Sequence, residues 1–367
     1  MIDELEALVI LTSIPNLGAV RIKQLIQHFG SAKAILETDS LTIAGFHDFG
    51  KQLIPHWGNW KKDRAWRENL ELVEKFGVTL ISYTDPRYPK RLLEIPDHPV
   101  LLYTLGELQP RDQNSIAVVG TRQASIYGRE LAERVSQQLA EAGYSVVSGL
   151  ARGIDTAAHS GAVRKGRTIA VIGSGLANIY PRENILLADL IAENGALISE
   201  FTMKTPPDRQ NFPQRNRIVS GMAEAAVLIE APLQSGAMLT MERARQYNRG
   251  LFAFPGRVDS EDFRGNHSLI KNGHAILVEN AQDILSSLGD FFGTGSTTTK
   301  PSPKRSVVLT KEEENLLKLL PNQEICIDKI MQLTQLPIMK VNALLMELLL
   351  KRLIKEYPGK TYKKLEL

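Results

Sequence analysis

One short segment of the chain gathers arginines around a phenylalanine. It reads Arg209-Gln210-Asn211-Phe212-Pro213-Gln214-Arg215-Asn216-Arg217. An aromatic ring flanked by guanidinium groups is typical of surfaces that hold single-stranded nucleic acid, because bases stack on the ring while the cations follow the phosphates. The same residues also fit a structural interpretation, in which Phe212 packs in the core and the arginines lie on a solvated face. The segment alone leaves both interpretations open.

Glycine turns follow several apolar runs earlier in the chain. Glycine lets a backbone approach a phosphate closely, and the helix after such a turn offers unpaired N–H groups. A single turn is weak support, because strand-to-helix turns often need glycine for steric reasons alone. Several in succession indicate a phosphate-binding edge. They are Gly120-Thr121-Arg122, Gly149 with Arg152 shortly after it, and Gly173-Ser174-Gly175.

A nucleotide cofactor fits these turns poorly. The Gly120 turn lacks the full G-x-G-x-x-G spacing, and the strand ending at Gly149 carries no acid for a ribose diol. The sequence also lacks the Gly-Lys-Ser/Thr ending of a P-loop. Arg122 and Arg152 instead stand near adjacent strand ends, where two guanidinium groups suit phosphodiesters. We therefore expect a polynucleotide ligand, with no bound cofactor and no metal.

The elements that position these turns are predicted from apolar periodicity. Continuous apolar runs indicate strands buried on both faces, as in a parallel sheet covered by helices. Residues 113–285 alternate such runs with amphipathic segments and predict an α/β fold with an extended, Rossmann-like, doubly wound parallel sheet. Ligands of such sheets bind at the carboxyl ends of the strands, where the glycine turns lie. The strands are expected at Ile116–Val119, Ser145–Val147, Ile169–Ile172, Ala196–Ile198, Ala226–Ile229 and Leu251–Phe254.

Four segments make up the expected organisation of the 367-residue chain. Residues 1–75 read as a helical N-terminal domain with a SAM-like or helix-hairpin-helix unit, whose hairpin can offer N–H groups to a phosphate or simply connect two helices. Residues 76–285 form the Rossmann-like domain. Residues 286–306 are expected to be a flexible linker, because much of the segment is rich in Thr, Ser, Gly and Pro. Residues 307–367 read as three helices and a β-hairpin, which together make a winged helix.

The predicted third helix of that winged helix offers little polar surface for reading base edges. Residues 341–350 are mostly apolar, whereas Lys360, Lys363 and Lys364 lie on the predicted wing. Phosphate contact by the wing therefore fits better than sequence readout. The surplus of Leu and Met fits either a protein contact or a small core.

The composition sets outer bounds on the function. The net charge of +3 and a pI near 8.8 permit nucleic-acid binding without arguing for it. The single cysteine, Cys326, rules out an intramolecular disulfide and a Cys-based zinc site, and its apolar neighbours predict a buried side chain. Neither a signal peptide nor a run of about 20 apolar residues is visible, so a cytoplasmic protein without membrane contact is expected.

Several motifs together resemble the DNA-processing protein A (DprA/Smf) family. The resemblance covers the α/β domain nearly end to end, and the flanking domains also fit that family. Two mild departures are Thr121, where the family often has Ser, and Ser174, where Cys is common. The motifs are Ala117–Arg122, Ser148–His159, Gly173–Leu176 with Ile179–Asn184, Phe212–Gly221 and Ser235–Thr240.

The resemblance implies a dimeric single-stranded-DNA-binding protein without established catalytic activity. It implies protection of incoming DNA in natural transformation and loading of the RecA recombinase, with displacement of single-strand-binding protein. Leu269, Ile270 and Ile276 become candidates for a homodimer surface, although core packing fits them equally. By carry-over, Arg122 grips phosphate, Arg209 supplies a cation and Phe212 stacks on a base. The expected DNA site comprises Gly120, Thr121, Arg122, Gly149, Arg152, Gly173, Ser174, Gly175, Leu176, Arg209, Phe212, Arg215, Arg217, Ser235 and Gly236.

Two groups of residues could instead indicate an enzyme, which is the alternative function. Asp155 and His159 stand four apart on a predicted helix and could form an acid–base pair, although Asp155 fits better as a cap that orders the Arg152 turn. Glu230 and Glu242, on either side of Ser235-Gly236, distantly resemble a phosphoribohydrolase that processes nucleotides. The glycine-rich motif of those enzymes is not reproduced, so the non-enzymatic interpretation is preferred.

Overall fold

The computed structural model of the chain describes residues 2–46, 57–292, 309–321, 325–351, 353–357 and 359–364. The chain forms two compact units, Met1–Gly295 and Ser296–Leu367. The expected boundary at residue 75 does not separate compact units, because one hydrophobic cluster joins Leu8 and Leu25 of the N-terminal helices to Leu101 and Tyr103 of the sheet. The domain limits drawn from the sequence therefore remain a proposal about the arrangement of segments inside the first unit.

The N-terminal segment is helical, as predicted. Asp3 caps the first helix in a capping box with Glu6, and Gly30 ends the second helix with a φ of 90° that glycine adopts without strain. The two helices flank the predicted hairpin at residues 14–18. The described elements are α1 (Glu4–Ser13), α2 (Ala19–Phe29), α3 (Ala32–Glu37), α4 (Ser40–Ala44), η2 (Asn59–Lys61) and α6 (Ala65–Lys75).

A nine-stranded sheet forms the centre of the first unit, in the order β1-β2-β6-β5-β4-β3-β7-β8-β9. In this order, every pair of neighbouring strands from β6 across to β9 is parallel. The strands β1 and β2 pair antiparallel and extend the sheet at one side. The strands are β1 (Thr79–Ser82), β2 (Leu101–Gly106), β3 (Ser115–Val119), β4 (Ser145–Ser148), β5 (Thr168–Val171), β6 (Ala196–Ser199), β7 (Ala225–Leu228), β8 (Gly250–Ala253) and β9 (Ile276–Leu277).

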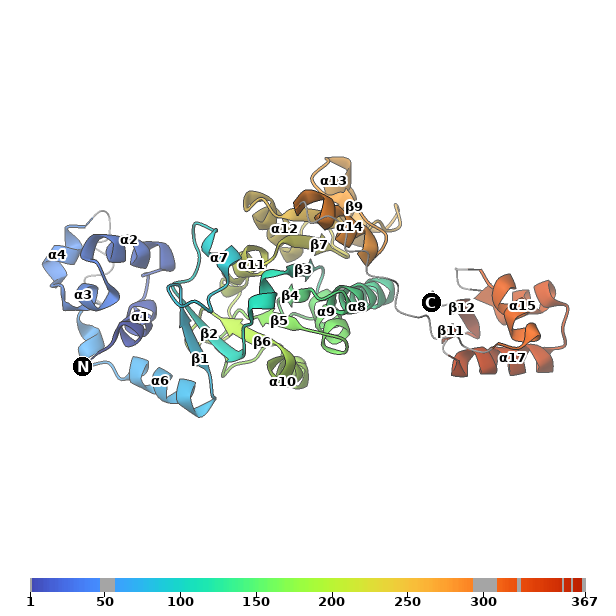
Figure 1. Cartoon of the computed structure of the whole chain (residues 1–367), viewed down its shortest axis with the longest axis horizontal. Coiled ribbons are helices and arrows are strands. Elements are labelled where there is room, and N and C mark those ends of the chain that lie inside the picture. Colours follow the sequence, from blue (N-terminus) through green and yellow to red (C-terminus); the bar gives the residue numbers. More distant parts are fainter. Residues whose placement is uncertain are drawn as a thin grey trace. The chain divides into compact units, whose positions relative to one another are not determined.

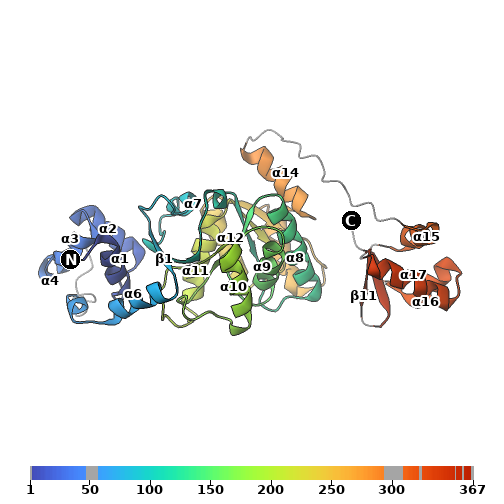
Figure 2. The ribbon, with the colours of Figure 1, turned by 60° about the horizontal axis from the view of Figure 1, so that its bottom comes forward.

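Helices cover both faces of this sheet, which confirms the predicted doubly wound α/β fold (Figures 1 and 2). One face packs against α8 (Ile126–Glu141), α9 (Ile154–Val163), α10 (Ile185–Asn194) and α14 (Ala281–Phe292). The other packs against α7 (Lys90–Leu93), α11 (Asn211–Met222) and α12 (Gly236–Gln246). Shorter pieces complete the unit: η3 (Pro110–Gln113), η4 (Arg182–Asn184), η5 (Glu261–Phe263) and α13 (Arg264–Lys271).

The strand order reverses between β3 and β7. The chain proceeds outward from β3 through β4, β5 and β6, then returns to place β7 on the other side of β3. At such a reversal the turns after the two strands diverge to opposite faces and leave a crevice between them. The turns after β3 and β7 therefore lie on either side of this crevice.

Part of the expected linker is helical. Helix α14 continues to Phe292 because Ile284 and Leu288 are buried in the core against α8. The expectation that the linker begins at residue 286 is therefore wrong for residues 286–292. Residues 293–306 lie outside the described residues.

The second unit has the predicted winged-helix elements. Its core includes Leu316, Ile330 and Leu345, one from each helix. The elements are α15 (Lys311–Leu319), β10 (Ile325–Cys326), α16 (Ile327–Thr334), α17 (Ile338–Leu350), β11 (Ile354–Tyr357) and β12 (Thr361–Lys364), with strand order β10-β12-β11.

Two sequence expectations are settled in this unit. Cys326 is exposed, so the prediction of a buried side chain is wrong; in β10 only its neighbour Ile325 faces the core. The apolar residues of α17 divide between core and surface, since Val341 and Leu348 are buried whereas Met339 and Met346 are exposed. None of the helices in the described ranges combines the length and apolar character that a bilayer span requires.

Candidate nucleic-acid interface

A cleft of about 630 Å³ lies at the carboxyl ends of β3 and β7, at the reversal of strand order. Three segments supply most of its walls: the turn after β3, the start of α11, and the turn after β7 with the start of α12. The predicted site residues that line it are Gly120, Thr121, Arg122, Gly149, Arg209, Phe212, Arg215, Ser235 and Gly236. The fold thus brings together residues that are more than 100 positions apart in the sequence.

Arg122 and Phe212 are in direct contact inside this cleft. The Cζ atom of Arg122 lies 4.7 Å from the centroid of the Phe212 ring, within the range of a cation–π interaction. The Arg122 side chain is exposed and Phe212 is half-buried. Gly173 leaves the room for the ring, because a Cβ atom there would lie 2.9 Å from Cδ1 of Phe212. The pair presents a guanidinium plane and an aromatic ring to the same solvent-open space.

Close packing inside the protein explains the glycines after β3 and β4. A Cβ atom at Gly120 would lie 2.4 Å from Cγ1 of Ile154, and one at Gly149 would lie 2.1 Å from Nη1 of Arg215. The amide of Thr121 donates a hydrogen bond to the carbonyl oxygen of Glu230 at 2.7 Å. These turns are therefore closely packed, and the glycines serve the protein's own contacts as well as any ligand.

Arg215 lies at the floor of the cleft and is buried. Its Nη1 donates to the carbonyl oxygens of Gly149 and Val171, which closes the carboxyl ends of β4 and β5. Burial lowers the pKa of Arg215 to about 10, while Asp155 nearby opposes the shift. The guanidinium is thus engaged within the fold, in contrast to the exposed groups of Arg122 and Arg209.

Arg217, the last arginine of the Phe212 segment, lies outside the cleft. Its Nη2 donates to the carboxylate of Glu200, and its Nη1 donates to the carbonyl oxygen of Asp97. The Arg217 side chain is only 11% exposed. Because successive helix positions face different directions, α11 turns Phe212 toward the cleft and Arg217 into the interior.

The turn after β5 is also placed differently from expectation. Gly173, Ser174, Gly175 and Leu176 are buried beneath the loop that follows β6. The amide of Gly175 donates to the carbonyl oxygen of Thr205 at 2.9 Å, and a Cβ atom there would lie 2.1 Å from the carbonyl oxygen of Thr202. The amide of Gly175 is therefore occupied by a protein contact, and the role of these four residues as a phosphate cradle stays a prediction.

The other predicted residues are exposed at the same edge or border the cleft. Arg152 is exposed and forms an ion pair with Glu183 beside the cleft. Ser235 caps α12, since its hydroxyl accepts from the amide of Met238 at 3.4 Å. Gly236 begins that helix, and a Cβ atom there would meet nothing within 4 Å, so the helix N-terminus opens on the cleft.

Sequence reasoning missed several cleft residues and one neighbour. Gln123 and Gln234 line the cleft from outside the quoted motifs, whereas Asn216 and Leu239 line it from within motifs but were not named as site residues. Tyr180 stands beside Phe212, with ring centroids 6.1 Å apart. Tyr180 lies within the quoted Ile179–Asn184 motif, but its role could not be predicted because only the fold brings it beside Phe212.

The candidate catalytic residues are used structurally. The Asp155 carboxylate accepts hydrogen bonds from the amides of Gly149 at 3.1 Å and Ala151 at 3.4 Å, which confirms its predicted ordering of the Arg152 turn. The prediction that Asp155 caps the helix is wrong, because Gly153 is the N-cap of α9 and, among the described residues, no side chain caps it. Burial raises the pKa of Asp155 and lowers that of His159 to about 3. The Nδ1 atom of His159 contacts the hydroxyl of Thr168 at 2.7 Å. The two side chains thus have separate hydrogen-bond partners.

The acids of the phosphoribohydrolase alternative do not converge. Glu230 is fully buried, and its carboxylate accepts from the amide of Ser125 at 2.9 Å and from its hydroxyl at 2.5 Å. Glu242 lies on the outside of α12 in an ion pair with Arg245. Neither carboxylate lines the cleft, so this geometry gives the nucleotide-hydrolysis alternative no support.

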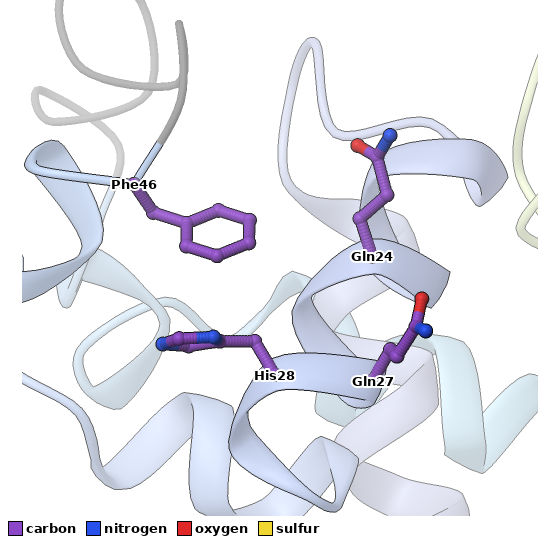
Figure 3. Close-up of a pocket in the computed structure, with 4 residues that line it drawn as sticks. All are labelled: Gln24, Gln27, His28 and Phe46. Carbon is purple, nitrogen blue, oxygen red and sulfur yellow. The ribbon is translucent and has the colours of Figure 1, made fainter.

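A second hollow, of about 400 Å³, lies among the N-terminal helices. Figure 3 shows Gln24, Gln27, His28 and Phe46 around it, with the His28 and Phe46 rings 4.7 Å apart. These four lining residues include neither lysine nor arginine, so phosphate binding has less support there than in the cleft with Arg122 and Arg209.

Comparison with known proteins identifies the family of this chain. Residues 79–289 match the family described as DNA recombination-mediator protein A, and residues 300–360 match the DprA winged helix domain. Protein Smf from Synechocystis is 31% identical over a region that covers 96% of this chain and 97% of that protein. The chain belongs to the DprA/Smf family. The resemblance seen in the sequence is thereby confirmed.

Two solved structures of DprA proteins are similar to this chain. The X-ray structure of DprA from Streptococcus pneumoniae has a TM-score of 0.66 at 33% identity and covers 78% of this chain and 98% of that one. A structure of DprA from Helicobacter pylori, described as giving insight into its single-stranded DNA binding mode, has a TM-score of 0.54 at 29% identity. It covers 59% of this chain and 97% of that one.

Proposed function

We propose that this chain binds single-stranded DNA across the cleft between the turns after β3 and β7. The observation that carries the proposal is the contact between the exposed Arg122 guanidinium and the Phe212 ring, 4.7 Å apart within the cleft. A cation and an aromatic ring in one groove match the two needs of a single strand, phosphate neutralisation and base stacking. The single-stranded DNA binding mode described for the Helicobacter pylori protein supports the same ligand class.

Six residues form the proposed contact set. Arg122 and Arg209 are its exposed cations, and Phe212 is its stacking ring. Thr121, Ser235 and Gly236 add a hydroxyl, a helix cap and a helix N-terminus on the opposite walls. The buried Arg215 and Arg217 are proposed to position these groups rather than to touch DNA.

In the cell, we propose the role implied by the family. The protein protects incoming single-stranded DNA, loads the RecA recombinase onto it and displaces single-strand-binding protein, in the bacterial cytoplasm and without a catalytic step. Membership in a family of DNA recombination mediators supports this role.

The proposed assembly is a homodimer. Ile276 is 42% exposed on β9, the edge strand of the sheet, so its backbone and side chain are accessible to a second copy. Leu269 and Ile270 on α13 pack partly against the core, which makes them supporting residues of the same surface.

The ligand class is tested by fluorescence anisotropy titration with a single-stranded oligonucleotide and the matching blunt duplex. The single strand should bind more tightly, because only its bases are free to stack on Phe212. Its log K should fall linearly with log salt, by about 0.7 for each phosphate neutralised. Equal or tighter binding of the duplex would contradict the proposal.

A further inference from the structure

We propose that Tyr180 forms a second base-stacking subsite, next to Phe212 and outside the cleft. The inference rests on the proposed function and extends the path of the strand from the β3–β7 cleft toward the end of β5. Its ligand is an unpaired nucleotide of the strand, whose base stacks on Tyr180 and whose phosphate lies near Arg152.

The geometry of the two rings favours neighbouring bases of an unstacked strand. Their centroids are 6.1 Å apart and their planes are inclined by 45°. Bases in a duplex are separated by only about 3.4 Å along each strand. Two bases that each lie on one of these rings would therefore be spread and tilted, as a single strand permits and a duplex does not. Tyr180 is 40% exposed, so its ring is accessible to such a base.

The loop that carries Tyr180 is held on both sides. Before it, the Asn178 side chain donates to the carbonyl oxygen of Lys204 at 2.7 Å. After it, the Asn184 side chain donates to the carbonyl oxygen of Leu150 at 2.9 Å and to the hydroxyl of Thr156 at 2.8 Å. A ring on a fixed loop loses little conformational freedom on binding, which favours a pre-organised platform.

A cation stands beside this platform. Arg152 is exposed, with 58% of its side chain accessible, and pairs with Glu183. The hydrogen bond to Glu183, which lies three residues after Tyr180, raises the pKa of Arg152 and keeps its guanidinium charged. An exposed ion pair of this kind contributes little to stability, so a phosphate can compete for the guanidinium at low cost.

The test compares Tyr180→Leu, Tyr180→Phe and the wild-type chain in titrations with a single-stranded oligonucleotide. Its length of about 20 nucleotides exceeds the roughly 4–16 nucleotides that one single-strand-binding domain usually covers. Tyr180→Leu should weaken binding by about 5- to 150-fold, the range that one stacked base contributes, with an unchanged salt slope. Tyr180→Phe keeps the ring and should stay within about threefold of wild type.

Tyr144→Leu is the matched control, because Tyr144 precedes β4 at the opposite edge of the sheet; its affinity should equal that of wild type. Wild-type affinity in Tyr180→Leu, while the wild-type chain binds the oligonucleotide, would overturn the subsite and leave the proposed function standing. Equal losses in Tyr180→Leu and Tyr180→Phe would also overturn it, since stacking needs only the ring. Failure of the wild-type chain to bind would instead refute the proposed function, and the subsite with it.

Discussion

Replacing Arg217 with methionine should lower the free energy of unfolding by about 3–5 kcal/mol, the usual effect of removing one partner of a buried ion pair. Arg217 links α11 to Glu200 after β6 and to the loop at Asp97. Its removal leaves the Glu200 carboxylate buried, with 13% of its side chain exposed, and without its guanidinium partner. Urea denaturation followed by tryptophan fluorescence measures the loss.

The stability loss in Arg217→Met should be larger at high pH than at low pH. Burial already raises the pKa of Glu200, and Arg217 opposes that shift, so the variant's folded-state pKa should be higher still. A folded state that holds a proton more tightly than the unfolded state loses stability as pH rises. The free energy of unfolding of Arg217→Met should therefore be closer to that of wild type at about pH 5 than at about pH 8.

Arg243→Met is the matched control, because Arg243 is exposed on α12 and the same substitution should change stability by no more than about 0.5 kcal/mol. For Arg217→Met, the salt slope of DNA binding measured on folded protein should equal that of wild type. A stable variant with a reduced salt slope would show that Arg217 contacts phosphate after all, as the sequence alone suggested.

Replacing Phe212 with leucine should weaken the binding of single-stranded DNA by about 5- to 150-fold, which corresponds to the 1–3 kcal/mol of one stacked base. The ring contacts both Gly173 and the Arg122 guanidinium, so leucine keeps apolar bulk there but removes the aromatic plane. The loss should appear at every salt concentration, because stacking releases no counterions. Anisotropy titrations at several salt concentrations measure both affinity and slope.

Arg122→Gln provides the contrast on the other member of the pair. It removes a charge and should reduce the salt slope by about 0.7, the contribution of one phosphate contact on a single strand. Phe212→Tyr keeps the ring and should retain most of the affinity. A variant Phe212→Leu that binds like wild type, with an unchanged unfolding transition, would contradict the stacking role.

Much of the sheet could be predicted because buried parallel strands are continuous apolar runs. All six expected strands occur within one residue of their predicted ends, from Ser115–Val119 to Gly250–Ala253. The glycine turns were also placed at the carboxyl ends of strands, where the fold has them. Local sequence determines such features, since burial on both faces fixes the residue types.

The roles of individual arginines could not be predicted, because partners distant in sequence decide them. Arg215 and Arg217 read as surface cations beside Phe212, yet Val171 and Glu200 bind them inside the fold. The Gly173 turn reads like the Gly120 turn, but the loop after β6 covers only the former. The pairing of β2 with β6 and the shared core with the N-terminal helices likewise depend on long-range contacts.

Photo-crosslinking with single-stranded DNA that carries 5-iodouracil tests the central claim most directly, because the excited base reacts with an aromatic side chain stacked upon it. Mass spectrometry of the digested complex should find the crosslink in the peptides that contain Phe212 or Tyr180, and Phe212→Leu should reduce its yield. Crosslinks confined to the winged-helix unit or to the N-terminal helices, with none at the carboxyl edge of the sheet, would contradict the proposed site.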